Sequence, residues 1–422
     1  MTEQLLQFIW QFQYYNKSNL ISNKGEEIQI IHPGFHNTNQ GPDFLNARVK
    51  IEDTILAGSI EIHINAGEWK VHKHSSDSNY NNVILHVVWI NNKNLEVDFS
   101  TLELSSRVSS LLLNKYESLM MNRNFIPCEE QIATVNEFTF TAWKERLIVE
   151  RLQEKATLIS IKLEKSNNHW EEIFWQLLAK NFGIKINSDA FESMAISIPL
   201  SILAKHKNQL HQLEAMLMGQ CGLLNNDFTN YYGVMLQKEY RFLQKKYDLK
   251  PTHMPLYFLR MRPANFPTIR LSQLAVLIHN SSHLFSIIKE AGNLKEVEKL
   301  LEVTANDYWH YHYSFDEETV FKKKKLGTQM IQNIIINTVL PFLYAYGWYN
   351  NAEPYKEKAL LWATQLLPEQ NFITKGFAEL GINNKSAFDS QALIQLKNKY
   401  CNHKRCLDCA VGNSILKKET AV

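Results

Sequence analysis

The sequence of 422 residues lacks an excess of charge of either sign. Its 45 lysines and arginines nearly balance its 43 aspartates and glutamates, so no global electrostatic field attracts a nucleic acid or an anionic membrane. The sequence also lacks a run of eighteen apolar residues, and its start has no basic segment followed by an apolar one. We therefore expect a soluble, cytoplasmic protein that contacts no membrane.

Cysteine is scarce and unevenly distributed. Three of the five cysteines, Cys401, Cys406 and Cys409, form a Cys-x4-Cys-x2-Cys motif, unlike the dispersed pairs of a secreted disulfide-bonded protein. This spacing suits thiolate ligation of Zn²⁺, with Cys128 among the candidates for the fourth ligand. It also approximates the spacing of an iron–sulfur site, which needs a fourth cysteine. Free cysteines in a reducing compartment are the alternative.

The hydrophobic period changes near residue 130 and predicts two domains, residues 1–129 and 130–422. In the first, a helical start precedes four β-rich runs, "EEIQIIH", "LNARVKI", "TILAGSIEIHI" and "VILHVVWI", which turn residues separate. Beyond residue 130, apolar residues recur at helical spacing. We therefore expect an α+β protein, with an α-β-β-β module followed by a mostly α-helical domain that carries a cysteine-rich tail.

Three details of the helical half are specific enough to test. The pattern predicts one helix over residues 188–204. It predicts another helix from about Leu271, after a segment that Pro263 and Pro267 interrupt. Pro341 lies inside an apolar helical pattern, which indicates a kinked and buried helix.

The strongest candidate site lies in "GPDFLNARVKIEDTILAGSIEIHI", residues 41–64. Side chains two residues apart share one face of a strand, so Glu61 and His63 point the same way, while Asp43 begins the preceding strand. Two carboxylates on neighbouring strands can hold Mg²⁺ or Mn²⁺, and the backbone carbonyl of Ile62 can add a further ligand. Such an ion neutralises a scissile phosphate and lowers the pKa of the attacking water. The pattern therefore predicts a site for phosphodiester hydrolysis.

The same stretch resembles the PD-(D/E)XK nuclease superfamily. Pro42-Asp43 is followed, after seventeen residues, by Glu61-Ile62-His63, within an α-β-β-β order. The resemblance implies a nuclease acting on DNA or RNA, in which Asp43 and Glu61 bind the metal and His63 takes the place usually held by lysine. Lysine offers a fixed cation to the phosphate or the water, whereas imidazole is largely neutral near pH 7.

Histidine is concentrated around this candidate site, because six of the fifteen histidines fall within residues 32–86. His72, His74, Asp77 and His86 are candidates for supporting groups or additional metal ligands. Neutral imidazoles suit Zn²⁺ or Fe²⁺ better than Mg²⁺. A hydrolase of a small substrate with a histidine-bound transition metal is therefore an alternative function.

An arginine-rich segment in the second half is a candidate for contact with nucleic acid. "RMRPANFPTIR" carries Arg260, Arg262 and Arg270 close to Phe266, so it can meet phosphates and stack a base. It can equally be an ordered connector whose arginines pair with acids. A non-catalytic scaffold that binds nucleic acid or protein, built on a decayed nuclease fold, is a further alternative for the whole chain.

Several longer stretches resemble one uncharacterised bacterial family, the domain of unknown function 2851. They include "GEEIQIIHPGFHNTNQGPDFLNARVKI", "WKVHKH", "RPANFPTIRLSQLA" and "CLDCAVG". The resemblance covers nearly the whole chain and implies a complete family member. It brings no activity, substrate or catalytic residue with it, so the functional interpretation depends on the residues above.

Overall fold

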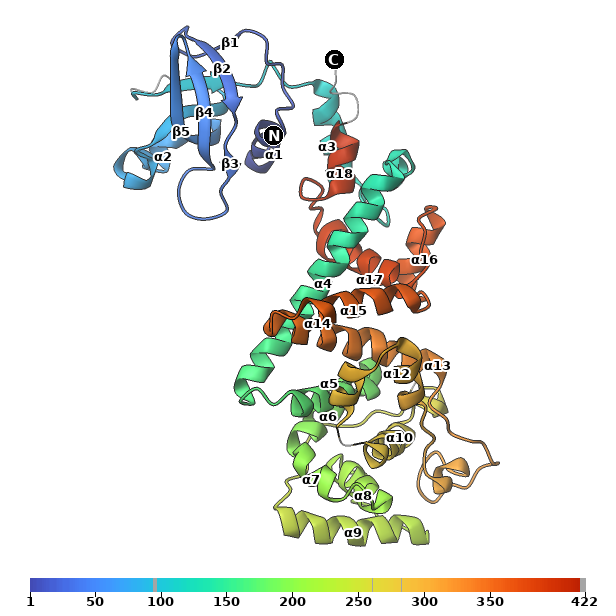
Figure 1. The fold of residues 1–422 in the computed structure, drawn as a ribbon. Helices are drawn as coiled ribbons and strands as arrows, with labels where there is room; N and C mark the ends of the chain where they lie inside the picture. The colour runs from blue at the N-terminus through green and yellow to red at the C-terminus, as the bar shows by residue number, and fades with distance from the viewer. Residues whose placement is uncertain (94–96, 260, 282, 418–422) are drawn as a thin grey trace. The chain divides into compact units, whose positions relative to one another are not determined.

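The structure is a computed structural model and describes residues 1–93, 97–259, 261–281 and 283–417. The chain forms two compact units (Figure 1). Unit 1 contains Met1–Lys144, Glu379–Gly381 and Gln395–Val422, and unit 2 contains Glu145–Ala378 and Ile382–Ile394. The N-terminal strands and the C-terminal cysteine motif therefore belong to the same unit.

Seven strands in the described part of the chain form one mixed sheet in unit 1. Its order is β1 (Leu20–Ile21), β2 (Glu27–His32), β4 (Phe44–Ile51), β5 (Thr54–Asn65), β6 (Val83–Ile90) and β7 (Ser100–Glu103), and β3 (Phe35–His36) also pairs with β4. Strands β1 to β5 pair in antiparallel fashion, whereas β5 pairs with β6, and β6 with β7, in parallel. All four predicted β-rich runs are strands.

Strand β5 is the buried centre of this sheet. Its residues from Gly58 to His63 are all buried, so that Glu61 and His63 are covered as well as Ile60 and Ile62. Helix α1 (Glu3–Phe12) packs against β5 and begins where the Thr2 side chain accepts a hydrogen bond from the Leu5 amide. A strand covered on both faces excludes water from any site that its polar residues form.

A short crossover joins β5 to β6, because parallel neighbours cannot be joined by a tight hairpin. It consists of α2 (Glu68–Val71) and the short 3₁₀ turns η1 (His74–Ser76) and η2 (Ser78–Tyr80). The Glu68 carboxylate fixes its start by accepting hydrogen bonds from the amides of Ile64 and Asn65, at 3.1 and 3.3 Å. The crossover brings His72 and His74 back beside β5.

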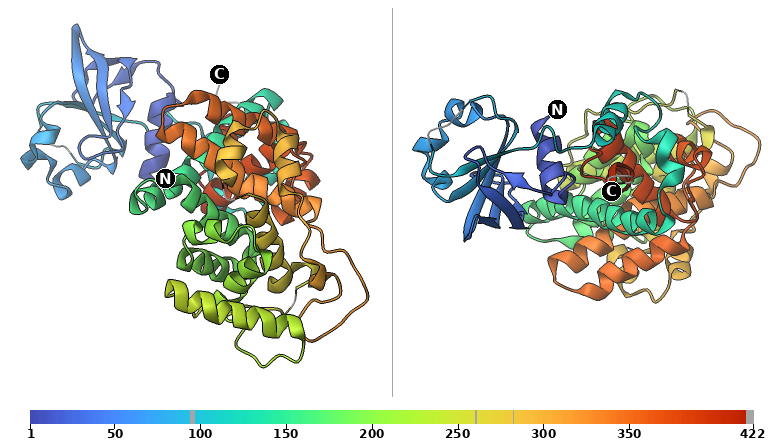
Figure 2. Two further views of the ribbon diagram at one scale, coloured as in Figure 1. Left: turned by 60° about the horizontal axis from the view of Figure 1, so that its bottom comes forward. Right: turned by 90° about the horizontal axis from the view of Figure 1, so that it is seen from above.

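The chain beyond residue 137 is mainly helical, which confirms the predicted helical C-terminal region. Its helices are α4 (Glu137–Lys165), α5 (Trp170–Phe182), α6 (Ile184–Ser197), α7 (Leu200–Lys205), α8 (Leu210–Gln220), α9 (Tyr231–Tyr247), α10 (Pro267–Asn280), α11 (Leu284–Glu290), α12 (Leu294–Leu301), α13 (Thr328–Ile334), α14 (Leu340–Tyr349), α15 (Glu353–Gln365), α16 (Phe372–Glu379), α17 (Ala387–Gln395) and α18 (Ala410–Lys417). Helix α3 (Ser110–Met121) precedes them in unit 1. Helices α14 and α15 lie side by side (Figures 1 and 2).

Prolines explain where two predicted helix boundaries were wrong. The predicted helix over 188–204 is interrupted, because α6 ends at Ser197 and α7 begins only after Pro199; a residue before proline disfavours helical backbone. The helix expected from about Leu271 begins four residues earlier, because Pro267 occupies its first turn. Proline is well suited to that position, where its missing amide hydrogen costs no helical hydrogen bond.

The helical pattern around Pro341 is interrupted as predicted. A π-helical turn, Ile335–Val339, separates α13 from α14, and Pro341 lies in the first turn of α14. The wider turn accommodates the hydrogen bond that proline cannot make. Leu340, Phe342 and Leu343 are buried, so this apolar segment belongs to the core of unit 2.

Gly219→Ala is expected to destabilise unit 2. Gly219 is buried in α8, and a Cβ atom at this position would overlap the ring of Tyr240 on α9. Overpacking of this kind costs about 1–3 kcal/mol. Thermal unfolding should show a lower melting temperature for Gly219→Ala, while Gly327→Ala, whose Cβ would meet no atom within 4 Å, should change it little. Equal melting temperatures for the two variants would contradict the packing of α8 on α9.

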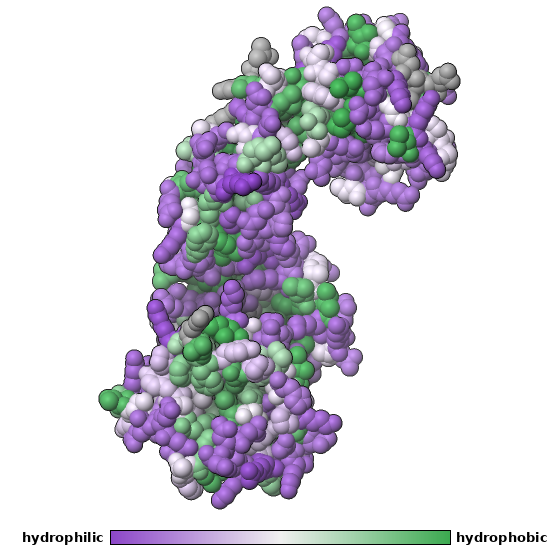
Figure 3. All heavy atoms as spheres, turned by 180° about the vertical axis from the view of Figure 1, so that it is seen from behind, coloured by the Kyte–Doolittle hydropathy of each residue, from purple (hydrophilic) through white to green (hydrophobic). Residues whose placement is uncertain are grey.

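The surface is mainly hydrophilic on the face that Figure 3 shows, and its hydrophobic side chains form separate patches. None of the described helices combines the length and the apolar character that a membrane crossing requires.

Candidate metal centre

Asp43 and Glu61 meet where β4 begins beside β5. Phe44 pairs with Ile60 across the two strands, which places the preceding Asp43 next to Glu61. Glu61 Oε2 accepts a hydrogen bond from the Asp43 amide at 3.1 Å, and Asp43 Oδ2 accepts one from the Ile62 amide at 3.0 Å. Each carboxylate is therefore held by the backbone of the other strand. The structure brings together the two acids that the sequence singled out.

The two carboxylates are unfavourable neighbours in the absence of a cation. Burial raises the pKa of Asp43 to about 7, and the Ile62 amide opposes this increase. Burial, and then the charge of Asp43, raises the pKa of Glu61 to about 8. A cation bound between these two buried carboxylates would neutralise their charge. The pair is therefore a candidate cation site.

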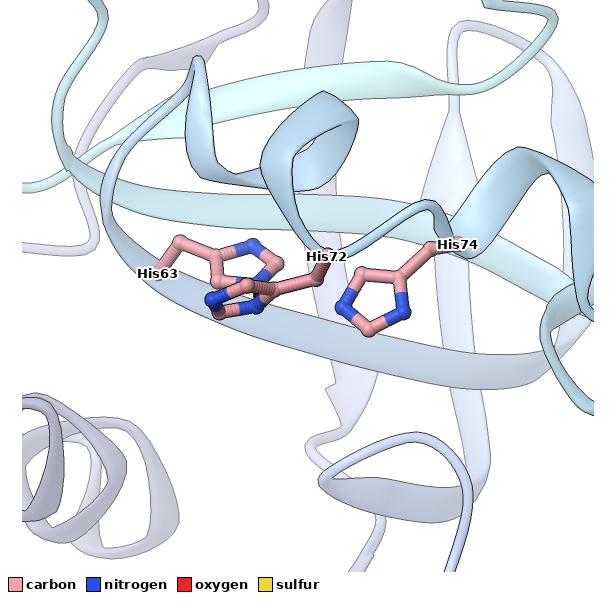
Figure 4. A group of neighbouring side chains, drawn as sticks. All are labelled: His63, His72 and His74. Atoms are coloured by element: carbon pink, nitrogen blue, oxygen red, sulfur yellow. Dashed lines mark hydrogen bonds between the residues drawn. The ribbon is translucent and has the colours of Figure 1, made fainter.

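Three histidines converge beside this acid pair (Figure 4). His63 lies on β5, His72 follows α2 and His74 begins η1. One ring nitrogen of each can be chosen so that all three lie within 4.8 Å of one another. His63 Nε2 is 3.2 Å from His72 Nδ1. His72 is exposed whereas the other two are buried, so the cluster opens to solvent at His72.

Glu61 connects the acid pair to the histidines. Its Oε1 lies 3.6 Å from His63 Nε2 and 3.4 Å from His74 Nε2. His74 Nε2 is buried and makes no hydrogen bond to the described residues. A carboxylate oxygen and imidazole nitrogens that face one another are the donor set that a divalent transition metal binds.

The buried histidines are in the form that binds metals. Burial lowers the pKa of His63 to about 4 and that of His86 to about 3, and burial also lowers the pKa of His74. All three rings are therefore neutral at pH 7. Neutral imidazole offers one lone pair to a metal, and its other nitrogen must carry the proton.

His86 on β6 orients His63. Its Nε2 lies 2.8 Å from His63 Nδ1. When His63 offers Nε2 to a metal, its proton is on Nδ1 and is donated to His86 Nε2. His86 itself is fully buried, and its Nδ1 has no hydrogen-bond partner among the described residues. His86 is thus a positioning residue behind the predicted ligand.

His86→Leu is expected to weaken metal binding about 10–100-fold, the effect of losing a hydrogen bond to a ligating histidine. His86→Gln can still accept the His63 proton through its amide oxygen, so it should recover part of this affinity. Calorimetric titration of Mn²⁺ into both variants measures the difference, with circular dichroism to establish that each is folded. Wild-type affinity in His86→Leu would contradict the positioning role.

Aromatic rings pack against the ring of His74. The Tyr80 ring stacks on His74 with a centroid distance of 3.9 Å, and the Trp69 ring meets it edge-on at 5.2 Å. Both rings line a pocket of about 480 Å³ that His74 and Phe99 also border. The cluster therefore adjoins a partly apolar cavity.

Sequence reasoning missed Gln7, which fixes Asp43. Gln7 on α1 donates from Nε2 to Asp43 Oδ1 at 2.9 Å and also reaches Glu3 Oε1 at 3.4 Å. The charge of Glu3 raises the pKa of Asp43, although Glu3 lies at the start of the helix. The sequence does contain one indication of this arrangement: Glu3 and Gln7 are four residues apart, which puts both on one face of α1.

Asp77 has a local structural role in the crossover. Its Oδ1 accepts a hydrogen bond from the Asn79 amide at 2.9 Å and so caps η2. Its charge also favours the protonated form of His74, against the effect of burial on the pKa. Asp77 shapes the loop that carries His74.

The other predicted groups belong to both units of the fold. Cys128, Cys401, Cys406 and Cys409 are all free thiols of unit 1. Arg262 and Arg270 border one pocket of unit 2, while Arg260 lies outside the described residues.

Residues 3–372 match the family described as "Protein of unknown function (DUF2851)". The chain belongs to the DUF2851 family. This confirms the family resemblance, and the matched range of this DUF2851 protein includes Asp43, Glu61 and every histidine of the cluster. Neither the curated proteins nor the solved structures contain a significant match.

Proposed function

We propose that this DUF2851 protein is a metal-dependent hydrolase that cleaves phosphodiester bonds in DNA or RNA. One observation carries the proposal: Glu61 meets Asp43 through one carboxylate oxygen and His63 and His74 through the other. Buried acids and neutral imidazoles thus surround one position, where a cation would relieve the repulsion of the acids and occupy the free nitrogen lone pairs.

The mixed donor set favours a divalent transition metal, Mn²⁺ or Zn²⁺, over Mg²⁺, because imidazole nitrogens suit Zn²⁺, carboxylate oxygens suit Mn²⁺, and Mg²⁺ takes oxygen ligands. Asp43, Glu61, His63 and His74 are the proposed ligands, and the carbonyl of Ile62 stays a predicted further one. When bound, the ion would neutralise charge on the phosphate and lower the pKa of the attacking water.

The remaining polar groups hold and orient the proposed ligands. Gln7 fixes one oxygen of Asp43, and the Ile62 amide fixes the other, so that this carboxylate has a single orientation. His86 fixes the ring of His63. Exposed His72 is the group that substrate reaches first, and its imidazole can transfer a proton to the leaving oxygen.

The strand arrangement supports the phosphodiester as substrate. The order of helix α1, the antiparallel strands β2, β4 and β5, and the parallel strand β6 supports the proposed likeness to the PD-(D/E)XK nucleases. In this proposal Asp43 and Glu61 are the metal-binding acids. The departure is His63 in place of lysine: with the pKa of His63 lowered to about 4 by burial, this ring supplies a metal ligand instead of a positive charge.

The test is cleavage by the metal-stripped chain after addition of Mn²⁺, Zn²⁺ or Mg²⁺. Substrates are labelled single-stranded DNA, double-stranded DNA and single-stranded RNA. We expect cleavage of at least one of them with Mn²⁺ or Zn²⁺, much less with Mg²⁺, and none with chelator. Tight metal binding without cleavage of any of these polymers would overturn the proposal. It would favour the alternative of a non-catalytic scaffold.

The pocket beside His74 favours a second candidate function, hydrolysis of a small substrate. Its volume of about 480 Å³ lies in the range of small-molecule sites. Bis(p-nitrophenyl) phosphate and p-nitrophenyl acetate, assayed beside the polymers, separate the two functions. Hydrolysis of either small ester without polymer cleavage would favour the second.

A further inference from the structure

Four cysteines from two distant parts of the chain approach one another in unit 1. Cys128 precedes the 3₁₀ turn η3 (Glu129–Thr134), Cys401 begins η8 (Cys401–His403), and Cys406 and Cys409 precede α18. Helix α18 packs against η3. Lys397, just before Cys401, donates from Nζ to the carbonyl of Phe125, just before Cys128, at 2.6 Å. These contacts join the two segments on both sides of the thiols.

The backbone around the thiols is closely fitted. The carbonyl of Cys406 lies against Gly412 so closely that any Cβ atom there would overlap it, so "CLDCAVG" requires its glycine.

The thiols are buried and influence one another. Cys128, Cys406 and Cys409 are each 7–8 % exposed. Burial, and then Cys409 and Cys406, raises the pKa of Cys128 to about 12. Burial, and then the other three thiols, raises the pKa of Cys401, while Lys397 opposes this. Buried cysteines that lie beside one another are shielded from solvent and can share one metal group, which binds them as thiolates.

The sequence spacing of the cysteines distinguishes between metal groups. Cys401, Cys406 and Cys409 form a Cys-x4-Cys-x2-Cys motif, which is the spacing of plant-type iron–sulfur proteins. Such a cluster needs a fourth cysteine from elsewhere in the chain. Cys128, which the contacts above bring to the same place, supplies it.

We propose that Cys128, Cys401, Cys406 and Cys409 hold an iron–sulfur cluster that fastens the C-terminal segment to the segment around Cys128. Lys397 and Lys404 lie close enough to lower the pKa of Cys401 and Cys406, respectively. Two cations beside the thiolates offset the negative charge of such a cluster.

The test is iron and acid-labile sulfide content after anaerobic production, in a His63→Ala background so that iron at the histidines is not counted. We expect iron and sulfide in equal amounts, with visible absorption that bleaches on reduction. Cys406→Ser should lose both, while Cys221→Ser, which removes a buried thiol of unit 2, should keep them. If Cys406→Ser does not fold, electron paramagnetic resonance of the reduced His63→Ala protein decides. Zinc alone, or no metal at these cysteines, would overturn the proposal.

A separate observation concerns a buried cation in unit 2. Arg270 is 6 % exposed. Its guanidinium donates to Gln273 Oε1 at 2.9 Å and to Asn265 Oδ1, but its Nε has no hydrogen-bond partner among the described residues. Burial lowers the pKa of Arg270 to about 10, and its hydrogen-bond partners are neutral amide oxygens, so that no carboxylate among the described residues compensates the charge. The predicted alternative, an arginine paired with an acid, does not describe Arg270.

The pocket around Arg270 is basic. Lys185, Arg262 and Lys325 line it together with Arg270, and its described lining contains no aspartate or glutamate. A buried, uncompensated guanidinium is costly unless an anion meets it, and its planar donors match a phosphate group. We infer that this pocket binds a phosphate group, either of a free nucleotide or of a nucleic-acid strand.

Thermal unfolding with inorganic phosphate, a mononucleotide and a single-stranded oligonucleotide tests this site. At ten times its dissociation constant, a ligand should raise the melting temperature of the wild type by about 4 °C. Arg270→Met should show no such increase and should still fold, because it removes an uncompensated buried charge. Arg262→Gln should lower the increase and Lys322→Gln, outside the pocket, should not. A larger increase with the oligonucleotide than with the mononucleotide identifies a nucleic-acid strand as the source of the phosphate group.

An equal increase in melting temperature for Arg270→Met and the wild type would overturn the inference. So would the absence of any increase with all three ligands.

Discussion

Glu61→Gln is expected to lower metal-dependent cleavage by on the order of 10³-fold, because it removes a carboxylate that contacts both Asp43 and the histidines. The substituted amide has the same shape and can still accept the hydrogen bond of the Asp43 amide, so the strands should keep their register. What it loses is the charge that holds the cation. Cleavage rates at saturating substrate, together with metal affinity, measure the effect.

A matched control distinguishes an effect on the site from the loss of one negative charge elsewhere on the sheet. Glu27 lies exposed on β2 of the same sheet, and Glu27→Gln should cleave at the wild-type rate. Cleavage by Glu61→Gln at a rate close to that of Glu27→Gln would exclude Glu61 from the reaction.

Metal binding is expected to be strongly dependent on pH. In the metal-free protein the pKa of Glu61 is about 8 and that of Asp43 about 7, both raised chiefly by burial. A metal must displace one proton from the pair between pH 7 and 8 and two below pH 7. Apparent affinity should therefore fall about tenfold per pH unit in the first range and up to about 100-fold per unit in the second. His63 does not compete for protons there, because its pKa is about 4.

Calorimetry of Mn²⁺ binding in buffers of different ionisation enthalpy measures the protons released. About two should be released at pH 6 and almost none at pH 9. Glu61→Gln, which loses the charge that holds the ion, should show little Mn²⁺ binding and little proton release at either pH. Proton release that is equal at pH 6 and pH 9 would show that the acids do not bind the ion.

The metal-free protein should become less stable as pH rises. A carboxyl group with a higher pKa in the folded than in the unfolded chain favours folding below its unfolded pKa, and this stability is lost as pH rises through the folded value. For Asp43 and Glu61 the loss falls between about pH 4 and 8. Chemical denaturation of the wild type should give a lower free energy of unfolding at pH 9 than at pH 5. The difference should be smaller in Glu61→Gln. A metal-free wild type that is equally stable at both values would contradict the raised pKa values.

The sequence predicted the elements of the sheet because their signals are local. Alternation marks β4, and turn residues such as Glu52 and Asp53 mark the hairpin that aligns Asp43 with Glu61. The family match was also predictable from contiguous stretches. Helix boundaries near Pro199 and Pro267 were predicted less well, because a proline can either interrupt a helix or occupy its first turn.

The full set of site residues was not predictable from spacing. His72 and His74 reach His63 only because the crossover folds back beside β5, and that depends on the hydrogen bonds of Glu68 to the end of the strand. His86 meets His63 through the parallel pairing of β5 with β6. Gln7 reaches Asp43 from a helix 36 residues earlier. Such contacts are tertiary, and a linear motif carries no record of them.

The most direct test of the metal centre is the anomalous scattering of Mn²⁺ in crystals of the metal-loaded chain. We expect one strong peak at about 2.1 Å from a carboxylate oxygen of Glu61 and from ring nitrogens of His63 and His74, and none at this position in Glu61→Gln. Fully occupied manganese elsewhere, with these three side chains unliganded, would contradict it.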